Sequence, residues 1–136
     1  MKNIKNDKKE NNLKENKVAL SFRENENKKV LFRLFNTKRE KSVSFAIYEK
    51  AKFSTTIKDA FNNDYRKVDI EYDTTKNNRF KKVNLLIDLN SYLDKSKINL
   101  YKDLISSNKE FIKNNKVDNS ILENIKFFEE RINNLK

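Results

Sequence analysis

The chain has 136 residues, a net charge of +11 and a hydrophobic share of only 36%, and it contains no Gly, Pro, Cys or His. The absence of cysteine excludes disulfides and thiolate metal sites, and the absence of glycine excludes the Walker loop and the dinucleotide-binding fingerprint. Because no histidine is present to assist a nucleophile or to hold a metal, we expect no enzyme activity, no cofactor and no bound metal.

The positive charge is concentrated in the first half of the sequence. Residues 18–66 carry eleven Lys or Arg against six acids, whereas residues 98–136 carry seven against six. Such an excess favours nucleic-acid phosphates or an anionic surface, although an A/T-rich genome also produces lysine-rich proteins and charge aids solubility. No apolar run of about 18 residues and no signal peptide is present, so we expect a cytoplasmic protein without a membrane partner.

The first elements follow from alternation and helical spacing. Residues 1–16 hold too few apolar side chains to fold, and we expect a flexible basic arm there. Residues 17–23 alternate and predict a short strand, whose apolar face would form a dimer core from Val18, Leu20 and Phe22. The next apolar stripe predicts a first helix around residues 25–35, with Val30, Leu31, Leu34 and Phe35 on one face.

A polar turn at residues 36–41 separates this helix from a second one, which is predicted to run from Ser42 or Ser44 to about Phe53. A short third helix follows, with Ile57, Ala60 and Phe61 at helical spacing. Four phenylalanines belong to these stripes or border them, so they are expected in the core rather than as stacking platforms for bases: Phe32, Phe35, Phe45 and Phe53.

Residues 65–136 are expected to add a hairpin and three helices. Alternating apolar residues predict strands at 68–72 and 83–87. Ser91, Ser107 and Ser120 are each followed three residues later by an acid, which predicts three helix starts. The last helix has apolar residues at heptad-like spacing, and this fits either packing on the core or a seam for a partner: Ile121, Ile125, Phe128, Ile132 and Leu135.

The order strand, helix, polar turn, helix in residues 17–53 resembles the ribbon-helix-helix family of DNA-binding proteins, of the Arc and MetJ type. The resemblance rests on the strand KVALSFR, the helix around VLFRLF and the stretch KSVSFAIYEKA. It implies a homodimer in which two chains pair their strands and place the ribbon in the major groove. A lone strand also needs a partner for its backbone groups, which independently favours a homodimer. The order partly recurs in residues 82–115, so a second copy of the unit stays open.

The resemblance assigns the base contacts to the outward face of the strand, with Lys17, Ala19, Ser21 and Arg23. A DNA phosphate is expected at the start of the second helix, where free N–H groups and the helix dipole attract anions beside Lys41, Ser42 and Ser44. Both sets also have a plainer interpretation, as the solvated face of a strand and as a helix cap.

We therefore expect a mainly α fold with short β-strands, divided into an arm (1–16), a ribbon-helix-helix-like unit (17–64) and a hairpin-and-helix part (65–136). The expected function is sequence-specific DNA binding by a homodimer. A DNA-binding unit followed by helices is similar to the ParR-type centromere-binding adaptors of plasmid partition, whose helical part would bind a filament-forming or regulatory protein; a small transcriptional repressor fits equally. The alternative is a protein-interaction module that uses its C-terminal helices without nucleic acid.

Overall fold

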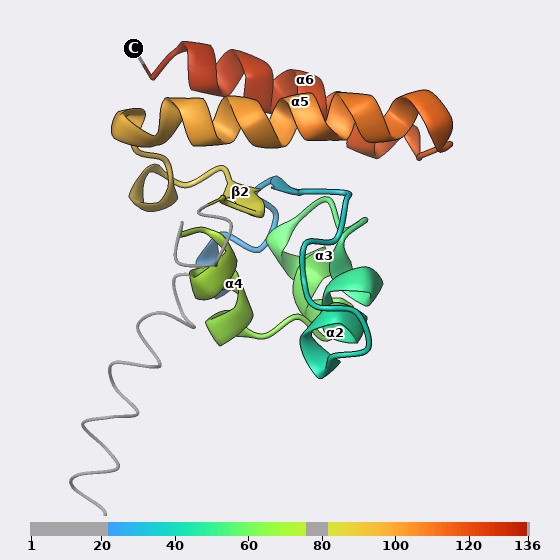
Figure 1. Ribbon diagram of the computed structural model, residues 1–136. Helices are drawn as coiled ribbons and strands as arrows, with labels where there is room; N and C mark the ends of the chain where they lie inside the picture. The colour runs from blue at the N-terminus through green and yellow to red at the C-terminus, as the bar shows by residue number, and fades with distance from the viewer. Residues whose placement is uncertain (1–21, 76–81, 136) are drawn as a thin grey trace, which may run out of the picture.

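Two apolar triplets far apart in the sequence, Val30–Phe32 and Leu85–Ile87, form the strands β1 and β2 at the centre of the computed structural model (Figure 1). The structure describes residues 22–75 and 82–135. The strands pair antiparallel, with Leu31 opposite Leu86. Every residue of both strands is buried, because helices cover both faces of the pair.

Three short helices between the strands cover one face. They are α2 (Val43–Ala51), α3 (Ile57–Asn62) and α4 (Lys67–Asp73). Ser42 and Thr56 cap α2 and α3, each by accepting a hydrogen bond from a backbone N–H three residues on. The Asp69 carboxylate accepts from the backbone N–H of Arg66 at 3.1 Å and so fixes the start of α4.

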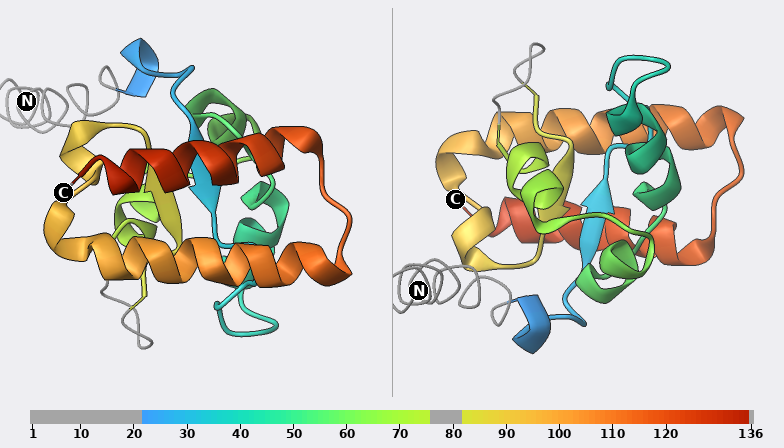
Figure 2. Two further views of the ribbon diagram at one scale, coloured as in Figure 1. Left: turned by 90° about the horizontal axis from the view of Figure 1, so that it is seen from above. Right: turned by 90° about the horizontal axis from the view of Figure 1, so that it is seen from below.

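Two long helices cover the opposite face. After β2 the chain passes through the 3₁₀ turns η1 (Asn90–Tyr92) and η2 (Lys95–Lys97) into α5 (Ile98–Asn114), and α6 (Asn119–Asn133) folds back along it. Figure 2 shows α5 and α6 side by side across the strands. None of the helices in the described residues is long and apolar enough to cross a membrane.

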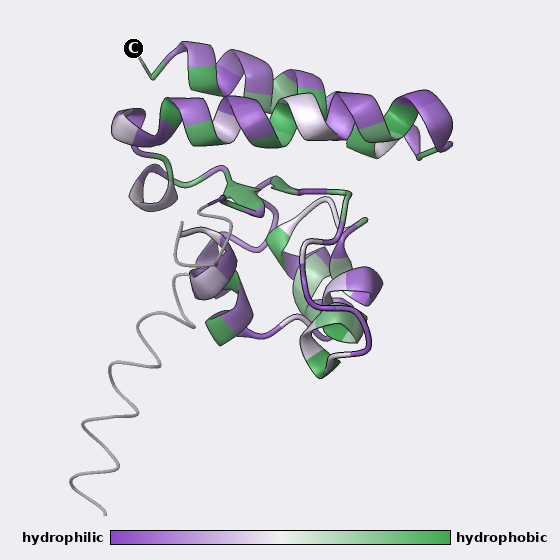
Figure 3. Cartoon of the chain, in the orientation of Figure 1, coloured by the Kyte–Doolittle hydropathy of each residue, from purple (hydrophilic) through white to green (hydrophobic). Residues whose placement is uncertain are grey.

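The alternation of the strands creates two cores, because successive side chains point to opposite layers. Leu31 and Leu86 pack against the stripes of α5 and α6, whose hydropathy alternates around each helix in Figure 3. The remaining strand residues pack with α2, α3 and α4: Val30, Phe32, Leu85 and Ile87. Each core thus combines residues from both of the units expected at 17–64 and 65–136.

The expected mainly α fold with short strands is confirmed, and so are several of its elements. Helices are present at α2 and α3, with Ser42 as the cap of α2, and β2 lies within the strand predicted at 83–87. The predicted C-terminal helix is α6, which begins one residue before Ser120. Its apolar stripe packs inside the chain, at Ile121, Ile125, Phe128 and Ile132, with Leu135 partly buried against the same core.

The helix predicted around residues 25–35 is wrong. Residues 30–32 form β1, and Leu34, which was to share the helical stripe, lies buried beyond the strand. A strand covered on both faces has a continuous apolar run, and over so few residues such a run also satisfies helical spacing.

The strand predicted at 68–72 is also wrong, since these residues lie in α4. Ile70 and Asp73 are buried three residues apart, whereas Val68 and Tyr72 are 56% and 46% exposed. The apparent alternation therefore joined one core residue to two surface residues. Without this strand the predicted hairpin does not form, and β2 pairs with β1 instead.

Two predicted helix starts are wrong. Ser91 lies in η1 and Asp94 caps η2 by accepting from the N–H of Ser96, so the long helix begins only at Ile98. Ser107 lies inside α5, which continues without a break to Asn114. A serine followed three residues later by an acid occurs on helix surfaces as well as at caps, so the pair alone does not mark a boundary.

Candidate nucleic-acid interface

The described strand pair has no outward face with which to read bases. One face is covered by α5 and α6 and the other by α2, α3 and α4. The free edge of β1 is also occupied: the Asn108 side chain accepts from the N–H of Leu34 at 2.8 Å and donates to the C=O of Phe32 at 2.9 Å. The Asn124 amide donates to the C=O of Val30 at 2.9 Å.

Three of the predicted base-reading residues lie outside the described residues: Lys17, Ala19 and Ser21. The same holds for Val18 and Leu20 of the expected dimer core and for the expected arm at 1–16. Arg23 is exposed and lies, with Phe22, in a helical turn rather than a strand. Phe22 is 2% exposed and packs within the chain, its ring centroid 5.7 Å from that of Phe61 and 5.9 Å from that of Tyr92.

The expected phosphate-binding residues gather at the start of α2. The Ser42 hydroxyl accepts from the N–H of Phe45 at 3.0 Å and donates to the C=O of Arg39 at 2.6 Å, so both of its hydrogen-bonding roles are used within the chain. Lys41 has a φ of 65°, in the left-handed region that a glycine would fill more easily, and its side chain is exposed. Ser44, the second residue of α2, is exposed.

A groove of about 300 Å³ lies between α2 and α4 and is lined by Ser44, Tyr65, Tyr72 and two cations, Lys38 and Arg66. Both cations are already paired. The Lys38 ammonium contacts the Asp73 carboxylate, and the Arg66 guanidinium donates twice to Asp69, at 2.9 Å each. The groove therefore carries little net charge toward a ligand.

Beneath this groove a buried polar network crosses the molecule. The Tyr48 hydroxyl donates to the C=O of Arg33, and the Arg33 guanidinium donates to the Asn84 side chain at 3.2 Å and to Asp103 at 2.7 Å. Burial raises the pKa of the Asp73 carboxyl, which Lys38 lowers only in part, and burial also raises the pKa of Tyr48 well above its ordinary value. These contacts connect β1, β2, α2, α4 and α5, which is a structural role.

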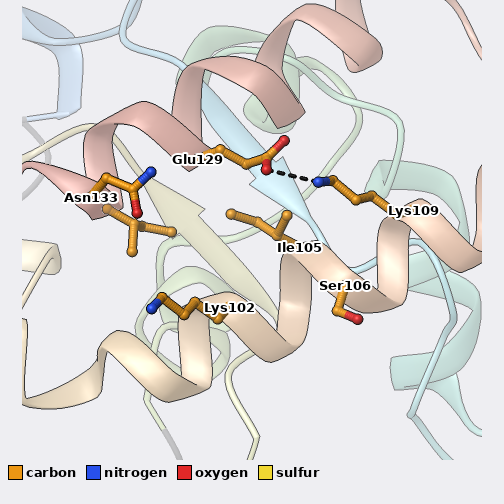
Figure 4. A pocket seen from close by; sticks show the side chains of 7 residues that line it. Lys102, Ile105, Ser106, Lys109, Glu129 and Asn133 are labelled. Atoms are coloured by element: carbon orange, nitrogen blue, oxygen red, sulfur yellow. Dashed lines mark hydrogen bonds and ion pairs between the residues drawn. The ribbon is translucent and has the colours of Figure 1, made fainter.

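A second groove of about 300 Å³ runs between α5 and α6 on their outer side. In Figure 4, Lys102 and Lys109 from α5 lie opposite Glu129 and Asn133 from α6, and Lys109 pairs with Glu129 at 2.7 Å. The groove thus has a mixed polar rim. No group of three Asp or Glu residues that could hold a metal ion occurs within residues 22–75 and 82–135.

An aromatic cluster on the surface was missed by sequence reasoning. The Phe35 and Phe53 side chains, expected in the core, are 47% and 46% exposed. Both rings contact Phe111 of α5, with centroids 5.1 and 6.3 Å away, and the Lys52 ammonium lies 5.3 Å from the ring centroids of both Phe53 and Phe111. The local signal was their polar neighbours, since Phe35 is followed by NTKREK and Phe53 stands between Lys52 and Ser54.

Comparisons of the chain with protein-family models, with curated proteins and with solved structures gave no match. The site must therefore be interpreted from its own residues.

Proposed function

We propose that this chain binds nucleic acid, held mainly through its phosphates. The observation that supports this most strongly is the distribution of charge. Residues 1–21 carry six lysines against three acids, and residues 76–81 carry Lys76, Arg79 and Lys81 with no acid. Several cations within the described residues form ion pairs with carboxylates: Arg33, Lys38, Lys50, Lys52, Arg66, Lys82, Lys109, Lys113 and Arg131.

Such a distribution gives phosphates a preferred place to bind. Ion pairs neutralise part of the positive charge of the described residues, whereas residues 1–21 carry twice as many lysines as acids and residues 76–81 carry three cations and no acid. Release of counterions from the phosphates then supplies binding free energy without any base contact.

The finer form of the proposal is a cytoplasmic homodimer that reads a DNA sequence, as a plasmid partition adaptor or a small repressor. We assign base reading to Lys17, Ala19, Ser21 and Arg23, of which Arg23 is exposed in a helical turn, since β1 and β2 are covered on both faces. Sedimentation of the full chain, alone and with duplex DNA, tests the number of chains in the complex.

Protein binding through the C-terminal helices is the weaker alternative. A docking helix needs an apolar face that is free, but the stripes of α5 and α6 pack against each other and against β1 and β2. The grooves on these helices retain a mixed polar rim.

The test is a titration of labelled duplex DNA with the full chain between about 50 and 200 mM salt, the range over which phosphate contacts lose most affinity. We expect the logarithm of the binding constant to fall linearly with the logarithm of salt, with a slope near −0.9 for each phosphate contacted. A variant with Lys76→Gln, Arg79→Gln and Lys81→Gln should have a shallower slope by about 0.9 for each of these side chains that contacts a phosphate.

The matched control removes three cations from the described residues, with Lys95→Gln, Lys97→Gln and Lys102→Gln, and should keep more of the salt dependence than the first variant. Duplex binding that is absent at the lowest salt, or that does not respond to salt, would show that duplex DNA is not the partner, and absence of single-strand binding as well would show that nucleic acid is not the partner.

A further inference from the structure

Three phenylalanine side chains from separate parts of the chain meet on one surface. Phe35 lies in the connection from β1 to α2, Phe53 follows α2, and Phe111 lies on α5. The outer two rings each contact Phe111, and each is nearly half exposed. Full burial of a phenylalanine side chain stabilises a fold, so two half-exposed rings forgo part of that gain. Exposed apolar side chains that gather at one place on a folded chain are often functional.

Charged and polar groups next to these rings fix the positions of the residues that carry them. The Lys52 side chain is only 10% exposed, its ammonium pairs with Glu49 at 3.0 Å, and it lies over the rings of Phe53 and Phe111. The Asn36 amide donates to the same Glu49 carboxylate at 3.1 Å and so ties the residue after Phe35 to α2. The rings therefore keep their arrangement before any ligand binds, which lowers the entropy cost of binding.

Two exposed cations lie before α2, at the opposite end of this helix from Phe53. Figure 2 places the connection from β1 to α2 on the α5 side. Arg39 and Lys41 are exposed on that connection, and neither forms an ion pair within the part of the chain that the structure describes. They precede α2 and Phe53 follows it, so about 14 Å separates them along a nine-residue helix.

Exposed aromatic rings together with exposed cations are the combination with which proteins bind single-stranded nucleic acids, since every base has a face that stacks on an aromatic ring. Building on the nucleic-acid function proposed above, we propose that the surface formed by Phe35, Phe53 and Phe111 stacks the unpaired bases of a single strand. Arg39 and Lys41 contact its phosphates. In a duplex the bases are already stacked on each other, so this surface distinguishes single strands from duplexes.

The first experiment measures binding of the full chain to a labelled oligothymidine strand and to a duplex of the same length, at one salt concentration. Phe35→Leu and Phe53→Leu keep the side chains apolar but remove the rings. Loss of one stacked base typically weakens binding about fivefold or more, so each variant should lose at least that factor for the single strand and little for the duplex. Phe61→Leu is the control, because Phe61 is 36% exposed and contacts Phe22, outside the cluster.

A second measurement reports on the ring itself. The chain contains no tryptophan, so Phe53→Trp introduces a single fluorescent indole at the surface. Stacking of a base should quench its emission on addition of oligothymidine, whereas Phe61→Trp should keep its emission. Thermal unfolding of each variant, followed by circular dichroism, confirms that the fold is retained.

The outcomes separate the two proposals. If the single strand binds but neither the Leu variants nor the emission of the Phe53→Trp variant responds, the stacking surface is wrong while nucleic-acid binding stands. If neither nucleic acid binds at low salt, both proposals fail. A dimer in sedimentation that Phe53→Leu converts to a monomer would assign the surface to a contact between copies of the chain and overturn the inference.

Discussion

Asn108 and Asn124 complete the hydrogen bonding of β1 from the helical layer. In a two-stranded sheet each strand has one edge without a strand partner, and a buried edge with unpaired backbone groups is costly. The two amide side chains reach this edge from neighbouring helices and bond the backbone at residues 30, 32 and 34. They therefore supply hydrogen bonds that the backbone of a third strand would otherwise make.

Replacing Asn108 by Ala should destabilise the fold by about 2 kcal/mol or more, because the change leaves a donor on Leu34 and an acceptor on Phe32 buried and unpaired. Urea unfolding measures the free-energy difference. Asn114→Ala near the end of the same helix is the control, since Asn114 is exposed, and it should change stability by less than about 0.5 kcal/mol. Equal losses in the two variants would contradict the role given to Asn108.

The buried Asp73 carboxyl makes stability depend on pH. Burial raises its pKa in the folded chain above the ordinary value of about 3.9, so the folded state binds the proton more tightly than the unfolded state. This contribution to stability is fully present below the ordinary pKa and is lost as the pH rises through the raised pKa.

Urea unfolding of the natural chain and of the Asp73→Asn variant from about pH 3 to pH 8 isolates this contribution, because the asparagine does not titrate. The free energy of unfolding of the natural chain, relative to the variant, should fall as the pH rises and then level off. Lys38, the charged group that pairs with this carboxylate, remains in both proteins. A difference that grows with pH would mean that Lys38 outweighs the cost of burial.

At the scale of single elements, the Ser42 hydroxyl at the start of α2 has two proposed roles, as a helix cap and as a contact to a DNA phosphate. Ser42→Ala removes the hydrogen bond to the N–H of Phe45 and should destabilise the fold by about 1 kcal/mol. Ser44→Ala should have an effect below about 0.5 kcal/mol, because this side chain is exposed. If Ser42→Ala leaves stability unchanged but weakens DNA binding, the hydroxyl serves the ligand rather than the helix.

Elements whose apolar residues lie on a single face could be predicted from the sequence. The stripe of α6 was placed correctly because one period fits it over two turns or more, and α2 was placed correctly as a helix, although Val43 and Phe53 of its predicted apolar positions are exposed. β1 was predicted as a helix and α4 as a strand. Three apolar residues in a row fit a doubly covered strand as well as a helix, and the alternation at 68–72 included the exposed Val68 and Tyr72.

The pairing of β1 with β2 could not be predicted from local pattern, because 52 residues separate Phe32 from Leu85 and no short turn connects the strands.

The aromatic surface was missed for a related reason. Whether Phe35 or Phe53 is buried depends on which helix lies above it, and α5 lies close enough to contact both rings without covering them. Exposure of this kind is a property of tertiary packing.

At the scale of the whole molecule, β1 and β2 make the two halves of the chain depend on each other. β1 comes from the first half and β2 from the second, and each strand contributes to both cores. A boundary at residue 64 would leave β1 without its partner strand and without the asparagines that occupy its other edge. The core around α5 and α6 would lose Leu31 and Leu34.

We therefore expect that residues 1–64 and 65–136, produced separately, do not fold as two stable domains. The first fragment should show no cooperative thermal transition, because a two-sided strand with only α2 and α3 beside it leaves most of its apolar surface in water. The second retains the α5–α6 pair but leaves Leu86 and Ile87 without the opposing strand.

Mixing the fragments should restore a single thermal transition, which circular dichroism at two protein concentrations measures. A cooperative transition in residues 1–64 alone would instead support an independent N-terminal DNA-binding unit, and its salt-dependent binding to duplex DNA would then be the measurement to compare with the full chain.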